Sequence, residues 1–393
     1  NLFSHIIGQI DNDNNGISGI EKSFDEELKE INEPLKLTVD VDIQFLIREE
    51  LLKFQKIFKA KGSAAILMNV NNGEILSMIS LPDFNLNKRE TIKNVNYINR
   101  ITKGIYELGS VFKTFTVASG INEGLIEPDT EFLDTKKSIK CGKKHNIEEY
   151  DNKMPSDLTV EQILIKSGNI GSVRILRKVG IEKHKLFLKT IGILDKINFD
   201  ISEVGKPQSI DWYEGCKLET IAFGHGITTT ILQLAKGYSI ITNGGYDIQP
   251  TLVKKNLEKK NKKKKVLKND VSKKMNSILR KVVTEGTAKL VNVEGYQVGG
   301  KTGTAEQVNN SVYSNTKINT LASIFPTDNP KYVLVVMLES TKNNKEYIYE
   351  YRDGTGFKLK GSPRNTAGWT SVEAAGKIID KIGPILATKY IEN

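Results

Sequence analysis

The chain has 393 residues, of which 38% are hydrophobic and 26% are charged, and its formal net charge is +10. This composition is that of a globular protein and excludes collagen-like and disulfide-dense chains, while the length predicts one large domain with a smaller module. No uninterrupted run of about 20 apolar residues occurs, so neither a transmembrane segment nor a signal peptide is expected. Because the chain starts at Asn1 rather than at a methionine, we expect a fragment or a processed chain, with any membrane anchor upstream.

The first third of the chain predicts a small polar module followed by a helix and a hairpin. Residues 1–34 are polar and loop-like, with one helical piece at 20–28. A strand is predicted at 35–41 and a helix at 43–60, from alternating and helically spaced apolar residues respectively. Two further strands, at 63–70 and 74–81, flank Asn71-Asn72-Gly73, which is a hairpin signal.

Helices dominate the middle of the chain and strands return near its end. The helix predicted at 110–121 is apolar on most faces, which places it in the interior. The other expected helices are 159–166, 170–179, 184–191, 230–242, 271–285 and 370–391, and the expected strands are 295–308, 320–325 and 332–339. This order predicts an α+β fold in which both ends of the chain contribute strands to one antiparallel sheet.

Much of the positive charge lies in one run. Residues 254–268 contain nine lysines and a single acidic residue, Glu258. Such a run can bind nucleic acid or anionic lipid, but no aromatic or arginine side chain is interleaved there to stack on bases or to grip phosphates. We therefore favour a solvated surface loop and expect no nucleic-acid partner.

The two cysteines, Cys141 and Cys216, are too few for a disulfide framework, although one bridge is possible. Spacing alone does not decide whether they pair. Cys141 and His145 have the spacing of half a metal site, but no second pair follows. No metal is therefore expected.

A serine and a lysine three residues apart, Ser110 and Lys113, begin the buried helix after Gly109. This spacing places both side chains on one helix face, and burial would favour the neutral amine, which can accept a proton from the hydroxyl. The alternative is a serine N-cap with a lysine that reaches solvent. The same pattern recurs at Ser314 and Lys317, but in a polar stretch that we interpret as a loop and discard.

Two further motifs follow in order. Ser167 and Asn169 lie in a turn after a helix, where a hydroxyl could relay a proton and an amide could hold a substrate; the alternative is an ordinary helix-ending loop. Lys301 to Thr304 (Lys-Thr-Gly-Thr) lie on a predicted strand. There a second cation would favour an anion, and Gly303 would admit a substrate backbone; the alternative is a β-bulge or a glycine-rich edge. Loose matches such as Lys166-Ser167-Gly168 show that each motif alone is weak.

The ordered set Ser-x-x-Lys, Ser-x-Asn and Lys-Thr-Gly resembles the active site of penicillin-binding proteins and serine β-lactamases. The resemblance extends over nearly the whole chain. It includes LTVDVDIQ (37–44), NNGEILSMISLPDFNLN (71–87), NRITKGIYELGSVFK (99–113), GHGITTTILQLAKGYSIITNGG (224–245) and TAGWTSVEAAGKIIDKIGPIL (366–386). The N-terminal segment resembles the pedestal linker of class B penicillin-binding proteins, and the closing segment resembles their division-specific, penicillin-binding protein 3-like branch.

The resemblance implies a transpeptidase domain at 35–393, with an antiparallel sheet flanked by helices and a helical subdomain, after the end of a pedestal module at 1–34. It implies these roles: Ser110 as nucleophile, Lys113 as general base, Ser167 as proton shuttle, Asn169 as ligand of the substrate amide and Lys301 as an electrostatic anchor, with Thr302, Gly303 and Thr304 along the substrate. The backbone N–H groups of Ser110 and Thr304 would form the oxyanion hole.

The implied substrate is a peptidoglycan stem peptide ending in D-Ala-D-Ala, which β-lactam antibiotics mimic, and no cofactor is implied. The implied partners are a septal glycosyltransferase and other division proteins, and the implied location is the bacterial inner membrane with the catalytic domain facing the periplasm. The nearest rival is a serine β-lactamase or a D,D-carboxypeptidase, which uses water as the acceptor. A β-lactam sensor and an inactive scaffold are further alternatives.

Overall fold

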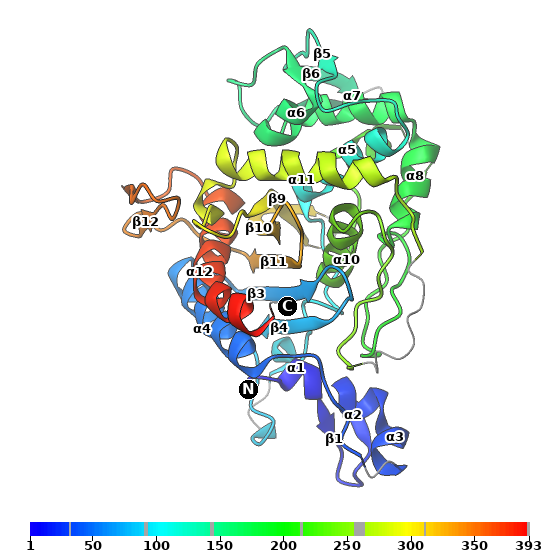
Figure 1. The fold of residues 1–393 in the computed structure, drawn as a ribbon, viewed down its shortest axis with the longest axis vertical. Coiled ribbons are helices and arrows are strands. Elements are labelled where there is room, and N and C mark those ends of the chain that lie inside the picture. Colours follow the sequence, from blue (N-terminus) through cyan, green and yellow to red (C-terminus); the bar gives the residue numbers. More distant parts are fainter. Residues whose placement is uncertain are drawn as a thin grey trace.

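The computed structural model describes residues 1–30, 33–89, 93–141, 145–212, 215–254, 264–309 and 312–390. At its centre lies a five-stranded antiparallel sheet in the order β4-β3-β11-β10-β9 (Figure 1). The strands are β3 (Gly62–Asn69), β4 (Ile75–Leu81), β9 (Gly299–Asn309), β10 (Val312–Phe325) and β11 (Tyr332–Glu339). Early and late segments of the chain thus meet in one sheet, which confirms the predicted α+β arrangement.

Helices cover both faces of the sheet. On one face, α4 (Val41–Ile57) packs against α12 (Ser371–Lys389); on the other, α10 (Ile231–Thr242) contacts α11 (Asn269–Thr284) (Figure 1). The central strand β11 is buried at every residue except Glu339. A strand covered on both faces has no solvent side, which explains its almost continuous apolar sequence.

A second, mostly helical lobe lies beyond α11 (Figure 1). It contains α5 (Lys113–Asn122), α6 (Val160–Lys166), α7 (Asn169–Val179), α8 (Ile181–Thr190) and α9 (Gly215–Thr220), with the strand pairs β5 (Glu131–Phe132) with β8 (Leu158–Thr159), and β6 (Ser138–Cys141) with β7 (His145–Glu148). Helix α5 contacts α6, α7, α8 and α11, and this explains why it is apolar on most faces. The functional site lies where this lobe meets the sheet.

The N-terminal residues form a small unit at the foot of the molecule (Figure 1). Its elements are α1 (Ser4–Ile7), β1 (Gln9–Ile10), β2 (Gly16–Ser18), α2 (Gly19–Ser23) and α3 (Asp25–Glu30). The helical piece predicted at 20–28 is confirmed as two short helices rather than one, because the chain turns at Phe24. A domain boundary at residue 34 stays a prediction.

The remaining short elements lie in the connections. They are the 3₁₀ turns η2 (Asn94–Asn96), η3 (Gly109–Phe112), η4 (Ile221–Phe223), η5 (Lys289–Val291) and η6 (Ala367–Trp369), and the strands β12 (Ile348–Glu350) and β13 (Lys358–Lys360). Within the described ranges, no helix combines the length and the apolar character needed to cross a membrane.

Two strand predictions differ from the structure. The segment 35–41 forms only an isolated bridge from Leu37 to Val253, because Asp40 caps α4 by accepting hydrogen bonds from the backbone N–H groups of Asp42 and Ile43. The strand expected at 320–325 is the end of the much longer β10, which starts at Val312. Ser314 and Lys317, which we expected in a loop, therefore lie on this strand.

A disulfide joins Cys141 of β6 to Cys216 of α9. It closes a sequence separation of 75 residues, which explains why spacing gave no signal for the pairing. Its formation uses the thiol of the Cys141–His145 candidate metal site. No group of three or more His, Cys, Asp or Glu side chains that could hold a metal ion occurs in the part of the chain that the structure describes.

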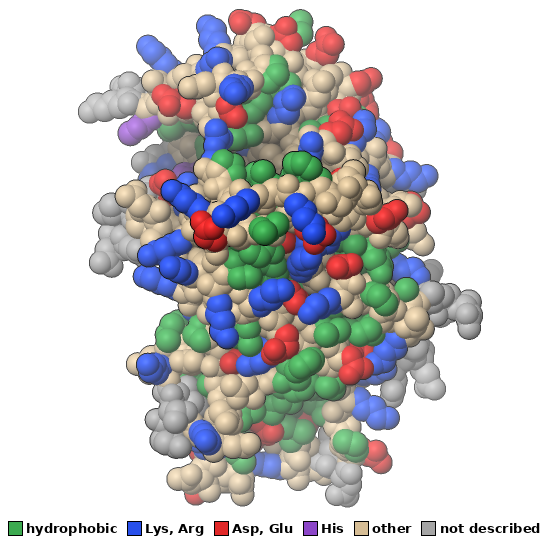
Figure 2. All heavy atoms as spheres, turned by 90° about the vertical axis from the view of Figure 1, so that its left-hand side faces the viewer, with side chains coloured by type: hydrophobic (Ala, Val, Ile, Leu, Met, Phe, Trp, Pro, Cys, Tyr) green, Lys and Arg blue, Asp and Glu red, His purple; other side chains and the backbone are tan. Residues whose placement is uncertain are grey.

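Charge is mixed rather than segregated on the face shown in Figure 2, where lysine and arginine side chains alternate with acidic ones. Most of the lysine-rich run 254–268, at residues 255–263, lies outside the described residues. The expectation of a solvated loop at this run therefore stays a prediction.

Candidate active site

A tight turn carries Ser110 into the space between the two lobes. Gly109 starts the turn η3 with a φ of +60°, and a Cβ atom on it would lie 2.8 Å from the carbonyl oxygen of Thr304. Only glycine meets both demands without strain, since a side chain disfavours positive φ and would collide with β9. Ser110 is half-buried, and its hydroxyl makes no hydrogen bond to any described residue, so it is available to a substrate.

Lys113, one helical turn after Ser110, is completely buried. Its amine donates to the carbonyl oxygen of Ser167 at 2.5 Å, to Oδ1 of Asn169 at 2.7 Å and to Oγ of Ser167 at 3.3 Å. The amine therefore links the helix of the first motif to the loop of the second. Its partners are Ser167 and Asn169 rather than the Ser110 hydroxyl.

Ser167 lies at the junction of α6 and α7 in a left-handed conformation, with φ 60° and ψ 41°. A residue other than glycine costs about 1 kcal/mol or more in this region, and such residues cluster at functional sites. Its hydroxyl also accepts a hydrogen bond from the amine of Lys301 at 2.9 Å. The strained turn thus presents one hydroxyl to two lysine amines.

Lys301 lies on β9 and is as fully buried as Lys113. Besides Ser167, its amine donates to the carbonyl oxygen of Thr302 at 3.1 Å. The next residues of the strand alternate: Thr302 and Thr304 line the cavity, while Gly303 does not. Thr302 shares a 2.7 Å hydrogen bond with Thr287, and Thr304 donates to Asn319 at 3.0 Å.

Burial sets the charge of the two lysines. It lowers the pKa of Lys113 to about 7, against an opposing effect of the Glu149 carboxylate. Burial also lowers the pKa of Lys301 well below its usual value, and repulsion from Lys113 lowers it further. The two amines therefore disfavour being charged together, which supplies an unprotonated amine near neutral pH. We predicted that Lys301 carries a positive charge, but its burial beside Lys113 disfavours the charged form.

Packing within the protein explains why a glycine occupies position 303. A Cβ atom there would lie 2.1 Å from the carbonyl oxygen of Leu108 and 3.0 Å from the Val111 side chain. The glycine therefore makes room for the turn that carries Ser110. The assignment of Gly303 as a substrate-binding residue stays a prediction.

We expect Gly303→Ala to push η3 away from β9 and to lower the free energy of unfolding by about 1–3 kcal/mol, as overpacking does. Denaturant unfolding measures this change. The control is Gly215→Ala, because a Cβ atom there meets nothing within 4 Å. Equal stability of the two variants would contradict the close packing of η3 on β9.

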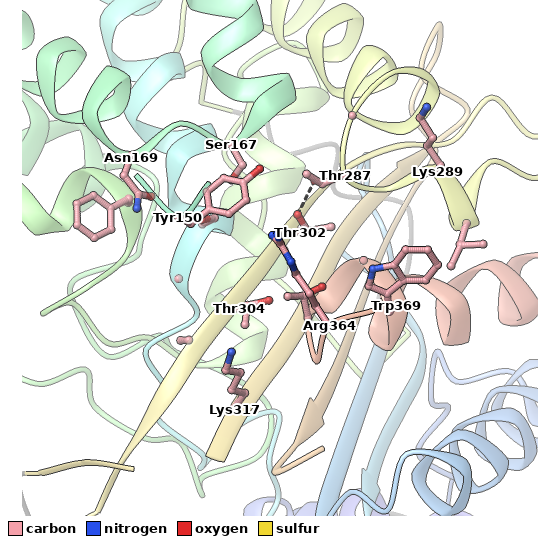
Figure 3. A pocket seen from close by; sticks show the side chains of 18 of the residues that line it. Tyr150, Ser167, Asn169, Thr287, Lys289, Thr302, Thr304, Lys317, Arg364 and Trp369 are labelled. Carbon is pink, nitrogen blue, oxygen red and sulfur yellow. Dashed lines mark hydrogen bonds between the residues drawn. The ribbon is translucent and has the colours of Figure 1, made fainter. Parts of the chain in front are cut away.

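The cavity around Ser110 has a volume of about 790 Å³. Figure 3 shows Tyr150, Ser167 and Asn169 on the side of the helical lobe, with Thr302 and Thr304 on β9 and Arg364 in front of them. Sequence reasoning gave no role to several side chains that line it. These are Tyr150, Phe223, His225, Thr287, Lys289, Lys317, Tyr351, Arg364 and Trp369.

Most of these side chains come from loops, where no periodicity marks them. Lys317 belonged to the second Ser-x-x-Lys pattern, which we discarded because we expected a loop, and His225 and Trp369 lie in segments that resemble the family without a role assigned to them. Lys317 pairs across strands with Glu306, and both residues line the cavity. Strand β9 is also the edge of the sheet, so a peptide could add to it as a further strand.

The fold and this serine–lysine centre define a class of protein. Residues 63–353 match the family model described as the penicillin binding protein transpeptidase domain, and the chain belongs to this family. This confirms the fold class and the family predicted from the sequence.

Individual relatives narrow the comparison. The chain is 29% identical to the probable peptidoglycan D,D-transpeptidase FtsI of Caulobacter vibrioides, over 98% of this chain and 65% of the relative. It is 30% identical to the peptidoglycan D,D-transpeptidase FtsI of Buchnera aphidicola, over 88% and 65%. The crystal structure of penicillin binding protein 3 from Mycobacterium tuberculosis complexed with aztreonam superimposes with a TM-score of 0.83 at 23% identity, over 99% of this chain and 89% of that one.

The chain spans 65% or less of the length of the first three curated relatives that it matches. The family is therefore established for the part of the protein described above. The penicillin-binding protein 3-like resemblance predicted from the sequence agrees with the FtsI and penicillin binding protein 3 names of these relatives.

Proposed function

We propose that this chain is a serine-type peptidoglycan D,D-transpeptidase that cross-links stem peptides in septal cell-wall synthesis. The observation that carries the proposal is the buried network in which Lys113 and Lys301 both donate to the Ser167 hydroxyl, beside the unengaged hydroxyl of Ser110. The names of the two FtsI relatives support the same activity.

In the proposed reaction, the Ser110 oxygen attacks the carbonyl carbon between the two D-alanines while neutral Lys113 takes the hydroxyl proton. The backbone N–H groups of Ser110 and Thr304 stabilise the developing oxyanion. Ser167 passes a proton to the leaving amine, the C–N bond breaks, and D-alanine departs from the acyl-enzyme. An amine of a second stem peptide then attacks the ester, forms the cross-link and restores the Ser110 hydroxyl.

The remaining residues hold the substrate. Asn169 binds the peptide amide, Thr302 and Thr304 align the substrate along the edge strand β9, and Lys301 faces the terminal carboxylate. A nearby carboxylate raises the pKa of an ammonium, so substrate binding restores the charge on Lys301. β-Lactams resemble the D-Ala-D-Ala end and acylate Ser110 in the same way, which the aztreonam complex of the mycobacterial relative supports.

We place the enzyme at the bacterial inner membrane, with this part facing the periplasm and working with a septal glycosyltransferase and other division proteins. The Cys141–Cys216 disulfide supports an oxidising compartment.

The products distinguish transpeptidation from hydrolysis. The chain is incubated with a stem pentapeptide ending in D-Ala-D-Ala and a second stem peptide that offers a free amine, and the products are separated by mass spectrometry. We expect cross-linked dimers and free D-alanine. A tetrapeptide without dimers, or rapid turnover of a β-lactam, would support a D,D-carboxypeptidase or a β-lactamase instead.

The rate constant for acylation by a β-lactam should fall as the pH drops through about 7, because that is the pKa of Lys113. Below this pH the amine is protonated and cannot accept the hydroxyl proton; above it, the neutral form prevails. Stopped-flow acylation over acidic to alkaline buffers measures the profile. A rate that stays constant through neutral pH would argue against Lys113 as the base.

A further inference from the structure

Helix α7 starts without a capping side chain of its own. Its N-cap is Gly168, and its first turn contains no acidic residue. The carboxylate of Glu149, which follows β7, instead accepts hydrogen bonds from the backbone N–H groups of Asn169 at 2.8 Å and Ile170 at 2.9 Å. It satisfies two amides that a helix start leaves unpaired, and its charge is favourable at this positive end of the helix dipole.

The same segment holds the Asn169 side chain. Nδ2 of Asn169 donates to the carbonyl oxygen of Glu148 at 3.0 Å, and Oδ1 accepts from the amine of Lys113 at 2.7 Å. The residue that meets Lys113 is therefore held at both its backbone and its amide group by two consecutive glutamates. Such restraint fixes one orientation of the amide oxygen and, through it, the position of the buried amine.

We propose that Glu149 is a positioning residue for the acylation of Ser110: by bridging two amides at the start of α7, its carboxylate holds Asn169 against the Lys113 amine. The inference rests on the serine acyl-transfer function proposed above. Glu149 acts through Asn169 and does not contact the reacting atoms.

The carboxylate also acts on Lys113 through its charge. Burial lowers the pKa of Lys113, and Glu149 opposes this shift. Lys301 on β9 shares the Ser167 hydroxyl with Lys113, and the positive charge of Lys113 lowers the pKa of Lys301, so the two amines disfavour being charged together. Removing the negative charge at position 149 therefore lowers the pKa of Lys113 further, and its proton-accepting form persists to lower pH.

The test is the pH dependence of β-lactam acylation in Glu149→Gln and Glu149→Asp. Glutamine offers one acceptor atom and no charge, so the rate constant should fall roughly tenfold to a hundredfold, as a misplaced group costs, and the acid limb of the profile should move to lower pH. Aspartate keeps the charge but is shorter, so its rate should fall while its acid limb stays in place.

Glu148→Gln is the matched control, because it removes the same charge at the neighbouring residue. The Glu148 side chain is exposed, and only the backbone of this residue contacts Asn169. We expect the wild-type rate and profile. Glu149→Gln with the rate and acid limb of this control would overturn the proposal, and so would a loss of rate matched by a lower melting temperature without movement of the acid limb. Failure of the wild-type chain to acylate at all would instead overturn the proposed function.

Discussion

Ser110→Ala abolishes labelling of the chain by a fluorescent penicillin, because it removes the only oxygen that the proposed mechanism lets attack the lactam carbonyl. The substitution deletes one half-buried hydroxyl without a hydrogen-bond partner among the described residues, so the fold should persist. Gel fluorescence after incubation with the penicillin measures labelling, and thermal unfolding confirms that the variant is folded.

The second Ser-x-x-Lys pattern offers the matched control. Ser314 lies on β10, where its hydroxyl donates to the carbonyl oxygen of Gln307 at 3.1 Å and shares a 2.6 Å hydrogen bond with Thr316. That hydroxyl is engaged within the strand region, so Ser314→Ala should be labelled like the wild type. Labelling that survives in Ser110→Ala, or disappears in Ser314→Ala, would show that the nucleophile is misassigned.

Lys113→Met should lower the acylation rate constant by about 10²- to 10⁴-fold, the usual contribution of a general base. Methionine keeps much of the length of the lysine and suits a fully buried position, but it cannot take a proton. Stopped-flow measurement of acylation tests the effect. The loss should persist at every pH, because no other group takes over the role.

Lys166→Met is the control for this substitution. Lys166 is exposed and immediately precedes Ser167, in the Lys-Ser-Gly triplet 166–168. The Ser167 hydroxyl accepts hydrogen bonds from Lys113 and Lys301, and not from the Lys166 amine. We expect an acylation rate near that of the wild type. Similar losses in Lys113→Met and Lys166→Met would mean that lost positive charge, rather than a lost base, explains the effect.

The sequence predicted the fold well where periodic burial decides the structure. The apolar run of β11 and the Asn71-Asn72-Gly73 hairpin gave strands that pair as expected, because the same side chains that set the pattern form the core. The motif residues Lys113, Ser167 and Lys301 were also predicted as neighbours, although 54 to 134 residues separate the partners of their hydrogen bonds.

The features of the site that could not be predicted from the sequence depend on tertiary contacts. The role of Glu149 could not be predicted, because its partners are backbone amides, which any residue type provides. The sequence predicted that Gly303 would admit a substrate backbone, but it did not identify the neighbour of Gly303 within the fold, the turn that carries Ser110. The polar stretch around Lys317 was interpreted as a loop because β10 extends far beyond the apolar residues at its end.

Intact mass spectrometry tests whether the folded chain brings a buried amine network to one attacking oxygen, that of Ser110. After incubation with benzylpenicillin, we expect a single stable addition of the antibiotic's mass, and peptide mapping should place it on the peptide that contains Ser110. An unmodified mass, or an adduct on a peptide without Ser110, would show that Ser110 is not the attacking group.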